Sequence, residues 1–184
     1  MIGAKGERPS LKATYREALK LGLKVARTAA VRPEADAPER YQNRHNGLAA
    51  YDAWAEHLLR DGDFPAGDEV ALQQRFSVHN GMVGSVAEAR WYGSQFLVGM
   101  AGHADTQVHR DAVEDILHAA ALYAGDHALM WNLWDLAGGI GNPQGWKLLA
   151  DPSVRRRMIP LIRQARENDQ QAATHLERAL SRWH

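Results

Sequence analysis

Four residues with aromatic or titratable side chains lie close together on one predicted helix and could form a binding site. Tyr123, His127, Trp131 and Trp134 are three or four residues apart within 112–136, a stretch that is apolar over most of its later turns. Residues at this spacing share a helical face. An imidazole among three aromatic rings is either a core histidine bonded to a carbonyl or hydroxyl group, or part of a pocket for a planar or cationic ligand. The sequence leaves both interpretations open.

A second group of polar residues lies on 82–101, whose almost uniformly apolar or small residues indicate a central helix. Burying Glu88 or Arg90 without a partner costs several kcal/mol, so each side chain must be paired or face a wet cavity. One interpretation is structural, with both residues tying neighbouring helices together. The other places them in a pocket beside Trp91, where Arg90 binds an anionic ligand and Glu88 acts as an acid or base.

Further candidates come from the neighbouring segments. His79 and Asn80 lie where two helical stretches meet, and they either cap a helix or line the mouth of a pocket. Tyr51 and Trp54 share one face of an earlier helix and either pack in the core or complete an aromatic-lined cavity. The candidate ligand-binding residues are therefore Tyr51, Trp54, His79, Asn80, Glu88, Arg90, Trp91, Tyr123, His127, Trp131 and Trp134.

Other chemistries find less support in the sequence. The chain has no cysteine, which excludes a thiol nucleophile, a disulfide and a thiolate metal site. Glu114 and His118 stand four residues apart, a spacing that suits two ligands of one metal ion, but an exposed helical charge pair explains them more simply. We expect no metal and no cofactor. From Arg155, Arg156 and Arg157 we expect a solvated basic face rather than an anion or partner site.

The overall composition is that of an ordinary globular protein. The 184 residues are 45% apolar and 24% charged, with 22 basic and 22 acidic side chains. Balanced charge argues against binding to nucleic acid or to a membrane surface, because both need a positive field. No apolar run approaches the roughly 18 residues that span a bilayer, and residues 1–9 lack a signal-peptide core. We therefore expect a cytoplasmic protein that contacts neither nucleic acid nor membrane.

The elements that must position the candidate residues are helices. Apolar residues recur at helical spacing along most of the chain, and no strand alternation is found. The pattern predicts a single all-α domain over 1–184, an antiparallel bundle of about five helices with an N-terminal extension over 1–9 and a long loop over 28–45. The predicted helices span 11–27, 47–60, 69–101 with a break left open near Asn80 and Gly81, 105–137 and, after a short turn at 146–149, 152–180.

Particular residues predict where these helices begin, end or bend. Ser10, Asn46, Asp68 and Asp151 are expected to cap helix N-termini, because their side-chain oxygens can accept bonds from free backbone N–H groups. Glycines at 138 and 139 are expected to end the fourth helix. Pro160 is expected to kink the last helix or to split off a short leading turn.

Several short segments resemble a known kind of domain. They are GAKGERPS at 3–10, NGLAAYDAW at 46–54, HN at 79–80, AEARWY at 87–92 and FL at 96–97. The chain resembles the helical domain that follows a papain-like or butirosin-biosynthesis-H-like N-terminal domain in many uncharacterised bacterial proteins. The resemblance implies a pocket or docking face at the matched positions Tyr51, Trp54, His79, Asn80, Glu88, Arg90 and Trp91.

The resemblance also implies a partner. We expect no such N-terminal domain within this chain, so the implied partner is that missing domain or a second copy of the chain in a homodimer. A cysteine-dependent activity is not implied, because the chain contains no cysteine.

Three functions follow from these observations. The first is a bundle that binds an unidentified small molecule in an aromatic-lined cavity, with Glu88, Arg90 and His127 as polar anchors. The second is an interaction or dimerisation module without a small ligand. The third is an enzyme that uses Glu88 and His127 as an acid–base pair. Of these three functions, we favour small-molecule binding over protein interaction, and protein interaction over catalysis.

Overall fold

Helices make up the fold. A computed structural model describes residues 9–29, 45–103, 107–139 and 141–183, and these form six α-helices and one short 3-10 turn. The helices are α1 (Leu11–Arg27), α2 (Leu48–Leu58), α3 (Glu69–Ala101), α4 (Gln107–Leu136), α5 (Trp146–Ala150) and α6 (Pro152–Arg182), with the turn η2 (Asp61–Asp63) after α2. The all-α prediction is confirmed. Nearly all of the predicted extension over 1–9, most of the predicted loop over 28–45 and the predicted helix start at Asp105 lie outside the described residues.

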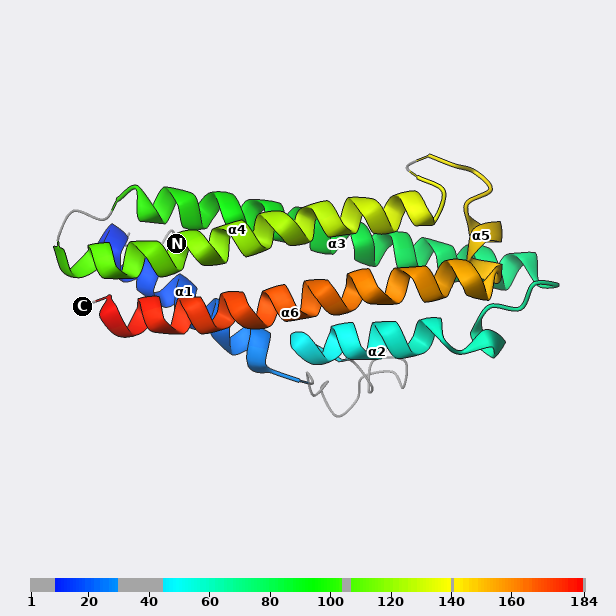
Figure 1. Cartoon of the computed structure of the whole chain (residues 1–184), viewed down its shortest axis with the longest axis horizontal. Coiled ribbons are helices and arrows are strands. Elements are labelled where there is room, and N and C mark those ends of the chain that lie inside the picture. Colours follow the sequence, from blue (N-terminus) through cyan, green and yellow to red (C-terminus); the bar gives the residue numbers. More distant parts are fainter. Residues whose placement is uncertain (1–8, 30–44, 104–106, 140, 184) are drawn as a thin grey trace, which may run out of the picture.

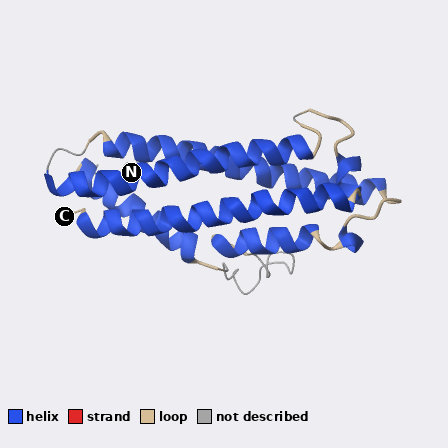
Figure 2. Ribbon diagram, viewed as in Figure 1, coloured by secondary structure: helices blue, strands red, loops and turns tan. Residues whose placement is uncertain are grey.

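Three long helices form the body of the molecule, and two short ones share the remaining position. In Figures 1 and 2, α3, α4 and α6 lie alongside one another and are joined at alternate ends. Helix α4 packs along both α3 and α6, while α1 and α2 both pack against α6. Helix α1 lies beside the second half of α6 and α2 beside its first half (Figure 1). The fourth position of the bundle is therefore broken between α1 and α2.

Asn46 and Gly47 hold the two sides of this break together. The Asn46 amide donates to the carbonyl oxygens of Val25 at 3.1 Å and Thr28 at 3.0 Å, at the C-terminal end of α1. The prediction that Asn46 caps α2 is therefore wrong, because its side chain serves the end of the preceding helix. Gly47 precedes α2 instead, with a φ of 53° and no side-chain cap. At that φ, and this close to the backbone of Ala26, a side chain would be strained.

Three other predicted N-caps and the predicted glycine end of the fourth helix agree with the structure. Ser10, Asp68 and Asp151 accept bonds from the backbone N–H groups of the first turns of α1, α3 and α6. Gly138 and Gly139 follow α4 with φ values of 97° and 80°, as a glycine-terminated helix requires. Helix α3 passes through Asn80 and Gly81 without a break, and α6 continues through Pro160 as one element. None of the described helices combines the length and apolar character needed to cross a membrane.

The buried apolar side chains form two clusters along the bundle. The α2-side cluster joins Leu58 of α2 to Leu72 of α3, Leu133 of α4 and Ile162 of α6. The α1-side cluster joins Leu19 of α1 to Leu97 of α3, Ile116 of α4 and Leu176 of α6. Each cluster therefore uses all three long helices and one of the two short helices.

Arg155 is buried at the end of the bundle that holds the α2-side cluster, where it bonds several segments of the chain. Only 1% of this residue is exposed, so the expectation of a solvated position is wrong for Arg155. Its Nε donates to the Leu58 carbonyl at 2.9 Å, and its other nitrogens bond the Leu149 carbonyl and the Asp61 carboxylate. The guanidinium carbon also lies 4.5 Å from the centre of the Phe64 ring. One side chain thus satisfies the ends of α2 and α5 at the beginning of α6.

We expect Arg155→Ala to lower the free energy of unfolding by about 3 kcal/mol, because it leaves buried carbonyl groups without donors. Urea denaturation measures this change. Arg156→Ala is the matched control, since Arg156 is exposed and its loss should change stability by less than about 0.5 kcal/mol. Equal effects of the two substitutions would contradict the role given to Arg155.

Candidate functional site

A layer of polar side chains separates the two apolar clusters. We call it the central polar layer, and it consists of Tyr51, Arg90, Tyr123, Asp126, Asn168 and Asp169. On α3, Arg90 lies between Ala87 of one cluster and Leu97 of the other. On α6, Asp169 lies likewise between Ala165 and Ala172. The layer crosses the bundle at the level where the fourth position passes from α1 to α2.

An ion pair between α3 and α6 is the centre of this layer. The Arg90 Nη2 atom donates to Asp169 Oδ2, and it lies 3.5 Å from the Tyr51 hydroxyl oxygen. The Arg90 guanidinium carbon lies 4.9 Å from the centre of the Tyr123 ring, a cation–π distance. Burial, followed by the charge of Asp169, raises the pKa of the Tyr51 hydroxyl, so Tyr51 stays neutral as a hydrogen-bond donor.

Asp126 adds a second carboxyl group beside Asp169. It is fully buried, and the Asn168 amide donates to its Oδ1 at 2.8 Å. Burial, and then the negative charge of Asp169, raises the pKa of Asp126 to about 8. Asp126 Oδ2 and Asp169 Oδ1 have no protein donor within the described structure. A proton on Asp126, hydrogen-bonded to Asp169, satisfies both oxygens and leaves the central polar layer uncharged overall at pH 7.

A cavity of about 530 Å³ opens onto this layer at the break between α1 and α2. We call it the central cavity. Ala18, Gly22 and Val25 of α1 line one side, and Leu48 and further residues of α2 and α3 line the others. Tyr51, Arg90, Tyr123 and Asp169 supply its polar wall. Its volume falls in the range of small-molecule sites, which are mostly apolar with a few fixed polar groups.

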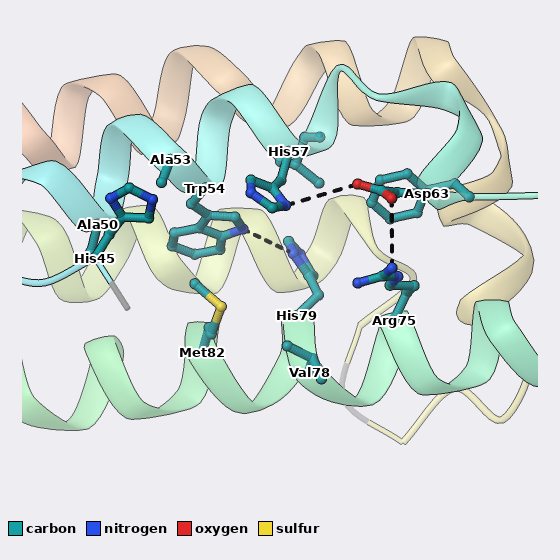
Figure 3. Close-up of a pocket in the computed structure, with 12 residues that line it drawn as sticks. His45, Ala50, Ala53, Trp54, His57, Asp63, Arg75, Val78, His79 and Met82 are labelled. Atoms are coloured by element: carbon teal, nitrogen blue, oxygen red, sulfur yellow. Dashed lines mark hydrogen bonds and ion pairs between the residues drawn. The ribbon is translucent and has the colours of Figure 1, made fainter. Parts of the chain in front are cut away.

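A smaller cavity of about 310 Å³ lies between α2, η2 and α3. We call it the apolar cavity (Figure 3). Trp54, which lines both cavities, donates from Nε1 to Nδ1 of His79 at 3.3 Å. Burial lowers the pKa of His79 to about 4. His57 and Arg75 lie at the same side of the cavity, 3.9 Å and 3.6 Å from the Asp63 carboxylate.

The aromatic residues singled out on α4 form a separate cluster against α3. His127 donates from Nδ1 to the Ala87 carbonyl at 3.0 Å and accepts from Trp131 Nε1 at 2.9 Å. The Trp91 ring lies 5.2 Å from the His127 ring, and the Trp134 ring lies 5.0 Å from that of Trp131. Both ring nitrogens of a neutral His127 are therefore engaged by the protein itself.

The structure distributes the eleven candidate residues over several places. Tyr51, Trp54, Arg90 and Tyr123 line the central cavity, and Trp54 and His79 line the apolar cavity. Trp91, His127, Trp131 and Trp134 form the α3–α4 aromatic cluster, which lies outside both cavity linings. Glu88 is exposed and lines neither cavity, while Asn80 has a buried Oδ1 without a donor among the described residues.

Asp126, Asn168 and Asp169 were not predicted from the sequence as site residues. Asp169 stands in the polar run ENDQQ at 167–171, which looks like a solvated helix face. It is, however, four residues after Ala165 and three before Ala172, so it occupies the position where the apolar stripe of α6 is interrupted. That interruption was the available signal.

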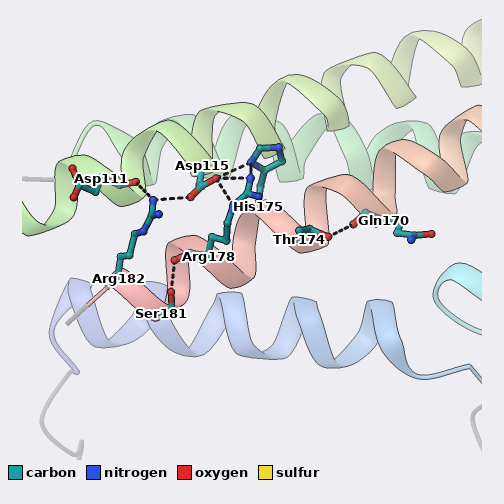
Figure 4. Close-up of polar contacts among 8 residues, drawn as sticks. All are labelled: Asp111, Asp115, Gln170, Thr174, His175, Arg178, Ser181 and Arg182. Carbon is teal, nitrogen blue, oxygen red and sulfur yellow. Dashed lines mark hydrogen bonds and ion pairs between the residues drawn. The ribbon is translucent and has the colours of Figure 1, made fainter.

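A further polar cluster lies near the C-terminal end of α6 (Figure 4). Asp115 accepts from His175 at 2.8 Å, Arg178 at 3.0 Å and Arg182 at 3.2 Å. Burial alone would raise the pKa of Asp115, but the hydrogen bonds from His175 and Arg178 outweigh it and lower the pKa. These bonds tie α4 to α6. Among the described residues, no group of three or more histidine or acidic side chains is arranged to hold a metal ion.

Comparisons of the chain with protein families, with curated proteins and with solved structures gave no match. The resemblance to a bacterial helical domain therefore stays a prediction.

The raised pKa of Asp126 gives stability a definite pH dependence. The folded-state pKa is about 8, whereas an unfolded aspartate titrates near 4. Between these values the folded protein binds the extra proton, so the contribution of Asp126 to the free energy of unfolding falls as pH rises. Asp126→Asn keeps a donor toward Asp169 without this proton. We expect the free energy of unfolding of Asp126→Asn, relative to that of the wild type, to be higher at pH 9 than at pH 5.5. Urea denaturation at the two pH values measures this difference.

Asp169→Asn is a second variant in this series. It leaves the Arg90 guanidinium without its carboxylate, so it should lower stability by about 3 kcal/mol at pH 5.5. It also removes the negative charge that raises the pKa of Asp126, so this loss of stability should become smaller at pH 9. A stability difference between Asp126→Asn and the wild type that does not change with pH would show that Asp126 is ionised throughout.

Proposed function

We propose that this protein binds a small molecule in the central cavity. The observation that carries the proposal is the position of a largely buried ion pair, Arg90–Asp169, in the wall of a cavity that is otherwise mainly apolar. A buried ion pair is costly to desolvate and is often no more stabilising than apolar residues of the same volume. An ion pair in the wall of a cavity, however, supplies the fixed polar groups that orient a ligand.

The chemistry of the cavity wall indicates the kind of ligand. Arg90 Nε is buried and has no acceptor within the described structure, so it can donate to an acceptor on the ligand. The charges of Arg90 and Asp169 balance, and Asp126 holds a proton at pH 7. An uncharged polar end therefore fits this wall better than an anion or a cation. The remaining lining, such as Leu21, Val25 and Met82, suits an apolar body.

An enzyme built on Glu88 and His127 receives less support. Glu88 is exposed, and neither residue lines the central cavity. Both ring nitrogens of His127 already bond Ala87 and Trp131, so a proton transfer to a ligand would first break one of these contacts.

A protein-interaction face is the second candidate function, because large aromatic side chains are exposed together on α3 and α4. Trp91 is 45% exposed, Tyr92 69% and Trp131 39%. Aromatic residues are enriched at protein interfaces, where one end of the side chain is buried and the polar atom finds a partner.

Sedimentation equilibrium tests this second candidate. If the aromatic face joins two copies, the protein sediments as a dimer at about 100 µM, and Tyr92→Lys shifts it to a monomer by at least about tenfold in Kd. Gln74→Lys, at an exposed position of α3 about five helical turns away from Tyr92, is the matched control. A monomer at every concentration would remove self-association from consideration.

The central cavity itself is tested by filling it. Gly22 lines the cavity and has nothing within 4 Å of an added Cβ, so Gly22→Leu should occupy ligand space without a clash. We expect Gly22→Leu to weaken binding of the neutral probe N-phenyl-1-naphthylamine by at least about tenfold, as measured by probe fluorescence. The same substitution at Gly81, which is also open but lines neither cavity, is the control.

Both leucine variants should fold, because replacing a helical glycine gains up to about 1 kcal/mol of helix propensity. Native mass spectrometry of the purified wild type and of Gly22→Leu extends the test to any ligand retained during purification. Undiminished probe binding by Gly22→Leu would overturn the assignment of the ligand to the central cavity.

A further inference from the structure

We infer that the apolar cavity is a second binding site, which takes a compact, uncharged, largely apolar carbonyl compound whose oxygen accepts a hydrogen bond from His79 Nε2. This site is separate from the central polar layer on which the proposed function rests.

The contact with Trp54 fixes the position of the His79 proton. An indole nitrogen carries a hydrogen and has no free lone pair in the ring plane, so it only donates. Trp54 Nε1 lies 3.3 Å from His79 Nδ1, and Nδ1 must therefore be the acceptor. The neutral ring then carries its proton on Nε2. Burial, which lowers the pKa of His79 to about 4, keeps the ring in this neutral form.

The Nε2–H group of His79 is a buried donor that lacks an acceptor. Only 4% of His79 is exposed, and Nε2 has no hydrogen-bond partner among the residues that the structure describes. Buried polar groups in proteins are nearly always paired, because an unpaired one loses its bond to water without replacement. His79 lines the apolar cavity, which is therefore the space from which we expect an acceptor to approach this donor.

The cavity lining defines the rest of the ligand. Ala50, Ala53, Phe64, Val78 and Met82 contribute apolar surface, and the Trp54 ring packs edge-on against His79 with centroids 5.5 Å apart (Figure 3). The volume of about 310 Å³ is at the small end of ligand sites.

The charged side chains at the apolar cavity are paired with one another, so the ligand needs no charge of its own. Asp63 is shared between Arg75 and His57 (Figure 3). The ligand that fits is therefore small, apolar and uncharged, with one acceptor atom for His79.

The apolar cavity is distinguishable from the central cavity by its own lining residues. The two share Ala50, Trp54 and Met82, whereas Ala53 lines only the apolar cavity and Gly22 lines only the central one. A leucine at either position therefore fills one cavity and leaves the other.

Two probes of the same shape test the inference. Acetophenone has a carbonyl oxygen where α-methylstyrene has a CH2 group, so the pair differs in the acceptor alone. We expect acetophenone to bind the full chain at least about fivefold more tightly and to shift the 15N signal of His79 Nε2 in NMR spectra. Ala53→Leu should abolish this shift, and Gly81→Leu should leave it unchanged.

Two substitutions of His79 itself distinguish loss of the hydrogen bond from loss of folding. His79→Gln retains an acceptor for Trp54 and a donor toward the cavity, so it should preserve the preference for acetophenone, whereas His79→Leu should remove it. Equal binding of the two probes, or no binding of either, overturns the inference. Loss of acetophenone binding in Gly22→Leu but not in Ala53→Leu also overturns it, because the probe would then occupy the central cavity and support the proposed function alone.

Discussion

The ion pair between Arg90 and Asp169 is the interaction on which the rest of the interior depends. It joins α3 to α6 inside the bundle, and its other contacts bring in Tyr51 of α2 and Tyr123 of α4. Removing Asp169 would leave the Arg90 guanidinium without a partner, and an unpaired buried charge costs several kcal/mol of stability. The second carboxyl group, Asp126, is accommodated because it holds a proton instead of a second negative charge.

This polar layer explains why the core is divided and why a cavity lies where it does. Apolar clusters pack on either side of the layer, one with α1 and one with α2. A single long helix in the fourth position would have to cross the layer, but the chain places two short helices there, tied together by Asn46. The central cavity opens at this junction, with the ion pair in its wall. Trp54 lies between this cavity and the apolar cavity and lines both.

The helices could be predicted from the sequence because their signals are local. Apolar spacing located the main helices, and Ser10, Asp68 and Asp151 located three N-termini through the chemistry of their own side chains. Asn46 was assigned to the wrong helix because the same amide can cap one helix or bond the end of another. Asp126, Asp169 and Arg155 were missed as buried residues, since their burial depends on partners more than 35 residues away. The central cavity is likewise set by the junction of α1 and α2, which no local sequence pattern predicts.

A direct measurement of the Asp126 carboxyl group tests the account most sharply. The 13C chemical shift of its side-chain carbonyl, followed by NMR from pH 3 to pH 10, reports the protonation of the buried pair. The expected result is that Asp126 titrates near pH 8. A midpoint near the ordinary value of about 4 would contradict it, because Asp126 would then be ionised at neutral pH and the central polar layer would carry a net negative charge.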